Sequence, residues 1–214
     1  MAPINRRLLR EHIYEDVLKR IMHGHFQPGS RLRDTMIADE LQVSRTPVRE
    51  ALVRLSQDGH LHADAGRGFK VRTLTPQEVR DLYPVAWTLE ILALRTSGSF
   101  SVTQLARLRE INAELGANAG SVEERISIDE SWHRTLLEGC ANGELLQLID
   151  TVKRRLRVYE HAYWYDASVA DSVDQHSRIL SAIESGDIDE AATVLEENFS
   201  KTMERLLSSL TPAV

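Results

Sequence analysis

The sequence predicts a mainly α-helical fold in two parts, and three observations lead to this prediction. The first third combines helical periodicity with two short strand-like segments. Strand signals disappear after Thr75. Charge divides at the same place, because residues 1–75 hold 13 Lys and Arg against 9 Asp and Glu, whereas residues 76–214 hold 13 against 23. We therefore expect a basic domain at residues 1–74 and an acidic, all-helical domain at residues 75–214.

Two helices are predicted at the start of the basic domain. Apolar residues recur every four positions in the first segment: Leu9, Ile13, Val17 and Ile21. This spacing predicts a helix over residues 8–24 that ends at Gly24. After a turn at residues 26–29, we expect a short helix over Met36, Ile37, Ala38 and Leu41, with Asp34 as its cap.

A third helix is predicted to begin at Ser44, with Pro47 in its first turn. Its apolar positions follow helical spacing: Val48, Ala51, Leu52 and Leu55. Arg45, Thr46 and Arg49 fall on another side. Arginine near a helix N-terminus opposes the helix dipole, so we expect these residues to contact an external polyanion, at base edges or phosphates.

Two short strands are predicted next, over residues 61–63 and 69–71. Three helices followed by a two-stranded ribbon form a winged helix-turn-helix. We expect the glycine-rich tip of the ribbon, at Gly66, Arg67 and Gly68, to reach phosphates or a minor groove, where the potential favours arginine.

The second domain is predicted to be an antiparallel six-helix bundle. Thr75 and Glu78 form a capping box around Pro76, which marks the first helix. Caps and glycine stops separate six amphipathic segments, at residues 76–97, 102–118, 122–140, 143–165, 169–185 and 188–210. Short connections between them favour the antiparallel arrangement.

Three polar residues fall on apolar stripes of this bundle. Asp129 and His133 are one helical turn apart, and His176 lies on a later stripe. Such residues are costly to bury unless they are paired or bind a metal. One carboxylate and two imidazoles suit a divalent transition ion. The alternative is a polar pocket in which Asp129 bridges the two histidines without an ion.

Composition indicates a cytoplasmic protein outside the membrane. No apolar run approaches the ~20 residues of a membrane span, and the first residues lack a secretory signal. Cys140 is the single cysteine, so disulfides do not hold the fold, and a reducing cytoplasm fits.

The run PGSRLRDTMIADELQVSRTPVREALVRLSQDGHLHADAGRGFKV, residues 28–71, resembles the DNA-binding domain of the GntR transcription regulators. VSRTPVREAL matches that family's motif almost without change. The remainder resembles the FCD effector domain of the FadR-type branch, in its shorter, VanR-like form. The resemblance implies a homodimeric, ligand-responsive repressor or activator that binds a short palindromic operator in double-stranded DNA.

The resemblance also implies roles for particular residues in DNA binding. The family's recognition helix uses residues that match Arg45, Thr46 and Arg49, and its wing tip matches residues 66–68. At Thr35, some relatives carry an arginine that touches DNA. Here we expect Arg31 or Arg33 to take that part instead.

For the second domain, the resemblance implies a metal site. Metal-binding FCD members use an Asp-x-x-x-His pair and two later histidines. Asp129, His133 and His176 match the first three positions, and Asn198 stands at the fourth. Asparagine is a poorer ligand than imidazole, so binding of zinc, nickel or a similar divalent ion is weakened or shifted toward a harder ion.

The effector is expected to be a small molecule bound in the second domain. Carboxylate-binding relatives often carry an arginine four residues before the position of Glu90, where this chain has Ala86. An organic acid remains one candidate, with Arg134 and the basic run at residues 153–157 as possible anion contacts. A larger or more aromatic ligand is another, in a pocket lined by aromatic residues: Tyr83, Trp87 and Trp132. The alternative is that these aromatics are plain core and the basic run is a solvated face.

Two functions follow from these patterns. The first is a transcription regulator, more often a repressor in such families, whose operator affinity changes when a metabolite binds the second domain. The second is a metal-dependent enzyme that uses Asp129, His133 and His176. We expect no enzyme, because no general base accompanies these residues and the DNA-binding third is intact.

Overall fold

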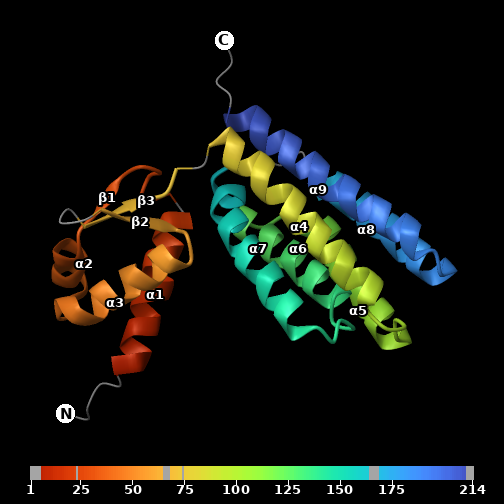
Figure 1. Ribbon diagram of the computed structural model, residues 1–214, viewed down its shortest axis with the longest axis horizontal. Coiled ribbons are helices and arrows are strands. Elements are labelled where there is room, and N and C mark those ends of the chain that lie inside the picture. Colours follow the sequence, from red (N-terminus) through yellow and green to blue (C-terminus); the bar gives the residue numbers. More distant parts are fainter. Residues whose placement is uncertain (1–5, 23, 65–67, 74, 164–168, 211–214) are drawn as a thin grey trace. The chain divides into compact units, whose positions relative to one another are not determined.

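The computed structural model of the protein describes residues 6–22, 24–64, 68–73, 75–163 and 169–210 (Figure 1). It divides into two compact units, Met1–Leu74 and Thr75–Val214. The first unit contains helices α1 (Arg6–Met22), α2 (Asp34–Leu41) and α3 (Arg45–Gln57). Both α1 and α2 pack against α3, so the third helix is central to this unit.

A small antiparallel sheet completes the first unit. Its strands are β1 (Arg31–Leu32), β2 (Leu61–Asp64) and β3 (Gly68–Val71), in the order β1-β3-β2. The predicted ribbon of β2 and β3 is present, and β1 is an addition that the sequence did not indicate. Two residues are too few to show alternation, so β1 exists only through its pairing with β3.

Two backbone positions shape the first unit. Gly68 has φ +95°, and a Cβ there would lie 2.8 Å from the carbonyl oxygen of Leu32. The turn between α2 and α3 places Gln42 at φ 52°, a left-handed conformation that non-glycine residues rarely adopt. The expected cap of α2 is wrong by one residue: Arg33 is the N-cap, and Asp34 is the first helical residue.

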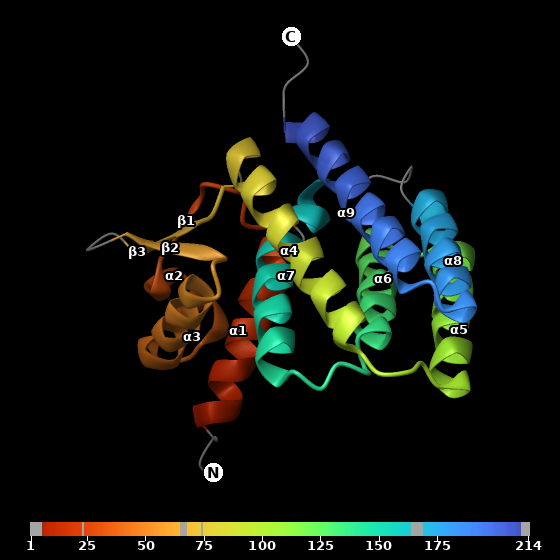
Figure 2. The ribbon, with the colours of Figure 1, turned by 45° about the vertical axis from the view of Figure 1, so that its right-hand side comes forward.

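Within the described residues, the second unit is the predicted bundle of six helices, and a mainly helical fold is confirmed. Its helices are α4 (Pro76–Thr96), α5 (Val102–Ala117), α6 (Val122–Leu136), α7 (Gly143–Tyr163), α8 (Val169–Ser185) and α9 (Ile188–Leu210). Helix α4 packs against both α7 and α9, and α5 packs against both α6 and α8 (Figure 2). Helix α8 also packs on α9, which closes the bundle around a core that contains Tyr83 and Trp132.

Helix caps in the bundle follow the predicted residues. The Thr75 hydroxyl accepts from the N–H of Glu78, whose side chain accepts from the N–H of Thr75. The same reciprocal box joins Ser121 and Glu124 at the start of α6. The two boxes satisfy backbone N–H groups at the N-termini of α4 and α6.

Candidate functional site

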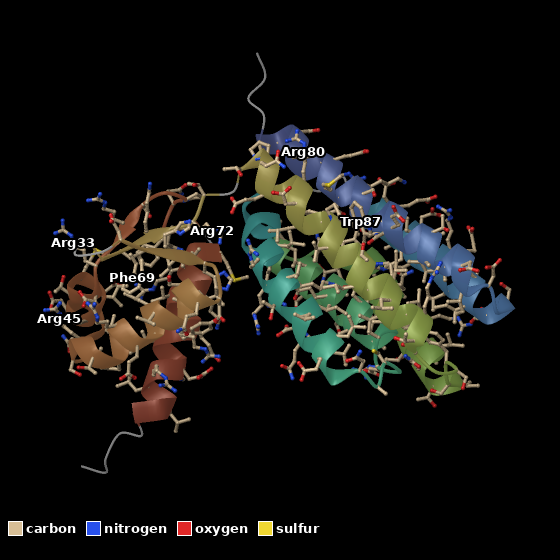
Figure 3. All side chains as sticks on the ribbon, viewed as in Figure 1. Arg33, Arg45, Phe69, Arg72, Arg80 and Trp87 are labelled. Carbon is tan, nitrogen blue, oxygen red and sulfur yellow. The ribbon has the colours of Figure 1, made fainter. Side chains whose placement is uncertain are left out.

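Helix α3 presents its arginines outward because its opposite side is fully buried. Val48, Leu52 and Leu55 have no exposed surface. The side chains of Arg45 and Arg49 are 62% and 68% exposed. Figure 3 shows Arg45 extending away from the unit, whereas Phe69 points into it.

The N-terminus of α3 differs from those of α4 and α6. Ser44 is the N-cap residue, as predicted, but its side chain makes no capping hydrogen bond. Thr75 and Ser121 do make theirs. The first backbone N–H groups of α3 therefore donate no hydrogen bond to the Ser44 side chain, and such groups suit a phosphate.

Predicted DNA-binding residues line one surface hollow of about 590 Å³. Those that line it are Arg31, Arg33, Arg45, Arg49 and Gly68, together with Thr35. Thr46 lies on a neighbouring hollow of α3, which Arg45 and Arg49 also line. The other two predicted residues, Gly66 and Arg67, lie outside the described residues.

The Asp34 carboxylate lies beneath Arg45 and Arg49. Nη2 of Arg45 is 3.2 Å and 3.1 Å from the two carboxylate oxygens of Asp34, and Nη1 of Arg49 is 3.6 Å from Oδ2. Burial by itself raises the pKa of the Asp34 carboxyl, but the hydrogen bond and charge of Arg45 outweigh it. The N–H of Thr35 and the charge of Arg49 add to this effect, so the pKa is lowered and Asp34 is ionised.

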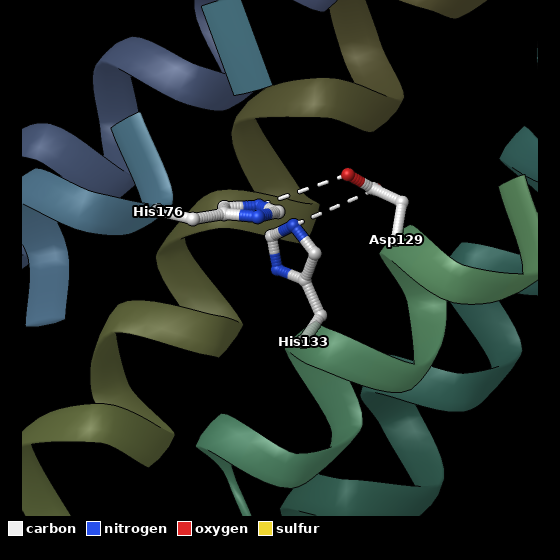
Figure 4. Close-up of side chains that lie close together, drawn as sticks. All are labelled: Asp129, His133 and His176. Carbon is white, nitrogen blue, oxygen red and sulfur yellow. Dashed lines mark ion pairs between the residues drawn. The ribbon is translucent and has the colours of Figure 1, made fainter. Parts of the chain in front are cut away.

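In the helical unit, Asp129, His133 and His176 come together as the sequence predicted (Figure 4). Helix α6 positions the first two one turn apart, and α8 supplies His176. Nε2 of His133 is 3.8 Å from Oδ2 of Asp129, and Nε2 of His176 is 3.7 Å from Oδ1. One donor atom from each of the three lies within 4.8 Å of the others.

The protonation of His176 follows from the amide of Asn112. Nδ2 of Asn112 donates to the carbonyl of Val173 at 3.0 Å, which can only accept, so the orientation of the amide is determined. Its Oδ1 therefore faces His176 and accepts from Nδ1 at 3.1 Å. Burial lowers the pKa of His176 well below its usual value, so the ring is neutral and Nε2 carries a lone pair.

Glu90 of α4 contacts Nδ1 of His133, as Asn112 contacts Nδ1 of His176. Nδ1 of His133 is 2.7 Å from Oε2 of Glu90, a fully buried carboxylate. Nζ of Lys153, on α7, is 2.7 Å from Oε1 of the same carboxylate. Burial alone raises the pKa of Glu90, but Lys153 and His133 overcome it and lower the pKa to about 2. The ionised carboxylate can only accept, so Nδ1 of His133 carries the proton.

These contacts decide which atoms of the cluster are open. Neither Oδ1 of Asp129 nor Nε2 of His176 has a hydrogen-bond partner among the described residues. A separation of 3.7 Å is too long for a hydrogen bond between them. Two imidazole nitrogens and a carboxyl group thus converge, and a divalent cation uses donors of these types. Burial also raises the pKa of the Asp129 carboxyl, although the charges of His133 and Lys153 oppose this effect.

The remaining predicted residues lie around this cluster in different ways. The Trp132 ring stacks on the His176 ring, with centroids 3.6 Å apart. Tyr83 is buried against Phe199, and Trp87 is half-buried on α4. Nδ2 of Asn198 donates to Oε1 of Gln175 at 3.0 Å. Trp132 and Tyr83 are therefore part of the bundle core.

Arg134 lies apart from those aromatics, on a cavity of about 310 Å³ between α6 and α7. Glu90, His133 and Lys153 also line this cavity. Its apolar wall consists of Leu137, Leu146 and Ile149. One side of His133 therefore faces the polar cluster, and another part of the same residue borders a space large enough for a small ligand.

Sequence reasoning gave no structural role to three residues that hold the cluster. Glu90 and Asn112 lie on the buried faces of α4 and α5, among apolar neighbours, so each carried the signal of a polar residue on an apolar stripe. Lys153 showed no such signal in the sequence, because this residue belongs to a basic run that is also typical of a solvated helix face.

A winged helix-turn-helix with outward arginines, joined to a helical unit with a buried polar cluster, defines a DNA-binding transcription regulator. The chain matches the family model of bacterial regulatory proteins of the gntR family at residues 9–71, and the FCD domain at residues 81–201. It belongs to the GntR family and carries an FCD domain.

Named relatives agree with this assignment. The chain is 32% identical over 192 residues to the Nta operon transcriptional regulator of Aminobacter aminovorans, covering 89% of this chain and 90% of that protein. It is 23% identical over 186 residues to a probable D-xylose utilization operon transcriptional repressor of Paenarthrobacter nicotinovorans, covering 86% and 82%. The structure of Escherichia coli McbR/YncC has the same fold, with a TM-score of 0.79 at 21% identity over 95% of this chain and 99% of that one.

Both named relatives are transcriptional regulators. The alternative of a metal-dependent enzyme finds no support among them. Among the described residues, no helix is both long and apolar enough to cross a membrane.

Proposed function

We propose that the protein is a homodimeric repressor that binds a short palindromic operator and releases it when a small organic acid binds the helical unit beside a divalent metal ion. The observation that carries this proposal is the cluster of Asp129, His133 and His176, whose open donor atoms face one another. Burying polar atoms without partners costs free energy, so such a cluster is more typical of a ligand-binding site than of a packed core.

Arginines of α3 would read the operator. Arg45 and Arg49 are exposed at the N-terminal part of a helix whose other side is anchored, and a guanidinium matches the two acceptors of guanine. Replacing either arginine with alanine should reduce the specific affinity by about 1–3 kcal/mol each. Binding to a selected operator, measured by fluorescence anisotropy, tests this.

A matched control removes the same charge elsewhere. Arg107 is an exposed arginine of α5 in the helical unit, where it pairs with Glu138. Arg107→Ala should leave operator affinity unchanged. If footprints of Arg45→Ala and Arg49→Ala on the operator match the wild-type footprint, the assignment of the recognition helix is wrong.

Asp129, His133 and His176 would hold the metal ion, with the carbonyl oxygen of Asn198 as a weaker fourth ligand. Glu90 and Asn112 support this set, because each accepts from the Nδ1 of one histidine and so orients Nε2. Imidazole nitrogens with one carboxylate favour zinc, nickel or a similar ion. When bound, such an ion supplies a positive centre for an acidic ligand.

Elemental analysis of the purified protein tests this site. The wild type should carry close to one divalent ion per chain, and the double variant His133→Ala, His176→Ala should carry none. His62→Ala is the control, because His62 is an exposed residue of β2. Equal metal content in the double variant and in the wild type would exclude the proposed ligands.

The effector would occupy the cavity that Arg134, His133 and Lys153 line. Its volume of about 310 Å³ lies at the lower end of small-molecule sites, and its apolar wall suits a short carbon skeleton. Arg134 is exposed and supplies a guanidinium for a carboxylate. Thermal shift with a panel of mono-, di- and tricarboxylates should identify a stabilising acid. Arg134→Gln should weaken its effect, and Arg107→Gln should not.

Release from DNA requires that the acid bind the free form more tightly than the operator-bound form. Repression is supported by the P. nicotinovorans relative, which is named a probable transcriptional repressor. In a reporter strain, deleting the gene should raise transcription from its operator, and adding the acid should do the same. Lower transcription after deletion would identify an activator instead.

Exposed apolar residues support a dimer. Val85 and Leu92 on α4 and Leu148 on α7 are each about half exposed, and α4 packs against α7. A two-fold dimer would present two copies of α3 to half-sites about one helical turn of DNA apart.

A further inference from the structure

Asp34 places a mostly buried negative charge beside the two arginines that are proposed to contact DNA. Its side chain is only 12% exposed, and it faces both proposed reading arginines. A negative charge on a surface that binds a polyanion opposes binding, because affinity for any DNA grows with the number of phosphates neutralised. Its presence under Arg45 and Arg49 therefore calls for an explanation.

The geometry of the pair with Arg45 leaves that residue able to bind DNA. Both oxygens of Asp34 bind the same nitrogen, Nη2, at 3.1 Å and 3.2 Å. Among the described residues, the other nitrogens of Arg45, Nη1 and Nε, have no hydrogen-bond partner, and a guanidinium donates in a planar fork. Asp34 therefore orients the Arg45 guanidinium through Nη2 and leaves its other N–H donors for DNA.

This hold has two consequences of opposite sign. An arginine already ordered in the free protein loses less side-chain freedom when it contacts a base. That favours the operator, where base edges match the fork. The carboxylate also offsets positive charge on the surface, and that weakens attraction to phosphates of any sequence.

We propose that Asp34 is a positioning residue that sets how strongly the protein discriminates its operator from other DNA. It orients Arg45, and secondarily Arg49, for contact with base edges, and it suppresses sequence-independent binding. This inference rests on the proposed reading of DNA by these arginines.

The test compares Asp34→Asn with the wild type, using the full-length protein. Asparagine keeps an acceptor oxygen for the N–H of Thr35 at the start of α2, and it removes only the charge and the strong hold on Arg45. Binding is measured by fluorescence anisotropy to an operator selected from random-sequence DNA and to a scrambled duplex, each at several salt concentrations. Far-ultraviolet circular dichroism checks the fold.

Asp34→Asn should bind the scrambled duplex more tightly and reduce the operator-to-scrambled affinity ratio about ten-fold. The plot of log affinity against log salt for the scrambled duplex should steepen by up to about one unit, which a purely structural role would not produce. Asp34→Glu, which keeps the charge, should retain most of the ratio and the wild-type slope.

Asp39→Asn is the matched control. It removes one carboxylate from the same helix, at an exposed position about 140° around the helix axis from Asp34. Its affinity ratio should equal that of the wild type. An unchanged ratio and salt slope in Asp34→Asn would overturn the inference, as would an equal change in Asp39→Asn.

Two results separate this inference from the proposed function. If Arg45→Ala retains full operator selectivity, the reading role itself fails. If Arg45→Ala loses selectivity while Asp34→Asn and Asp34→Glu both keep it, only the positioning role fails. If Asp34→Asn does not fold, Asp34→Glu provides the test, because it keeps the negative charge. A folded Asp34→Glu that loses operator selectivity would overturn the proposed role of that charge.

Discussion

Replacing Glu90 with alanine is expected to destabilise the helical unit by about 3–5 kcal/mol. Glu90 is fully buried, and its two oxygens lie 2.7 Å from Nζ of Lys153 and 2.7 Å from Nδ1 of His133. Without the carboxylate, the mostly buried ammonium of Lys153 has lost the partner that neutralises it. Breaking a buried pair from one side costs several kcal/mol for that reason.

The pKa of Glu90 supports the same magnitude. Its lowering from 4.5 to about 2 corresponds to about 3 kcal/mol of stability above the range in which the carboxyl titrates. Two different routes therefore lead to a similar figure.

An exposed ion pair provides the comparison. Asp150 and Arg154 lie one turn apart on α7, with side chains 61% and 39% exposed and a separation of 2.5 Å. Asp150→Asn should cost less than about 1 kcal/mol, because water screens the pair and its side chains lose conformational freedom. The two pairs differ mainly in burial, so their contrast isolates its effect.

The assay is urea denaturation followed by tryptophan fluorescence, with a chelator present so that bound metal does not contribute. All three tryptophans, Trp87, Trp132 and Trp164, lie after residue 75, so the signal reports on the helical unit. In the double variant with Lys153→Met, most of the loss from Glu90→Ala should be recovered. The reasoning is refuted if Glu90→Ala costs no more than Asp150→Asn, or if the two substitutions simply add.

Three further outcomes are expected. Because the pKa of Glu90 is lowered in the folded protein, its contribution to the free energy of unfolding is fully present above about pH 4.5 and is lost as the pH falls toward about 2. Urea midpoints measured across this range should therefore fall less steeply with pH in Glu90→Gln than in the wild type. The same pH dependence in both proteins would contradict this prediction. Gln42→Gly should stabilise the DNA-binding unit by about 1 kcal/mol, because glycine adopts the left-handed conformation at φ 52° without strain; amide hydrogen exchange in α2 and α3 should slow, and faster exchange would argue against strain there. The isolated segment 75–214 should sediment as a dimer and Leu92→Glu as a monomer; a monomeric wild-type segment would exclude the bundle as the dimer interface.

Local patterns predicted most of the fold. Helical periodicity and capping residues located all six helices of the bundle, and the largest shift is at α6, which ends at Leu136 instead of residue 140. Such signals lie within one or two turns of chain, so the sequence displays them directly. Strand β1 was missed because two residues carry no period of their own.

The candidate sites divide in the same way. Asp129 and His133 are one turn apart, so their shared face was evident from spacing. Their meeting with His176 was expected from its apolar stripe and from the family resemblance. The contacts with Glu90, Lys153 and Asn112 were not expected, because they depend on how α4, α5 and α7 are rotated against α6 and α8.

The sequence by itself determined the two-part organisation, the anchored helix with its outward arginines and the donor types of the cluster. Only the tertiary structure decided that Asp34 lies beneath Arg45 and Arg49, and that Glu90 and Asn112 direct the two histidines toward Asp129. The physical reason is range. Period and capping act between neighbours in the chain, whereas a carboxylate of one helix meets a side chain of another only after packing has fixed the rotation of both.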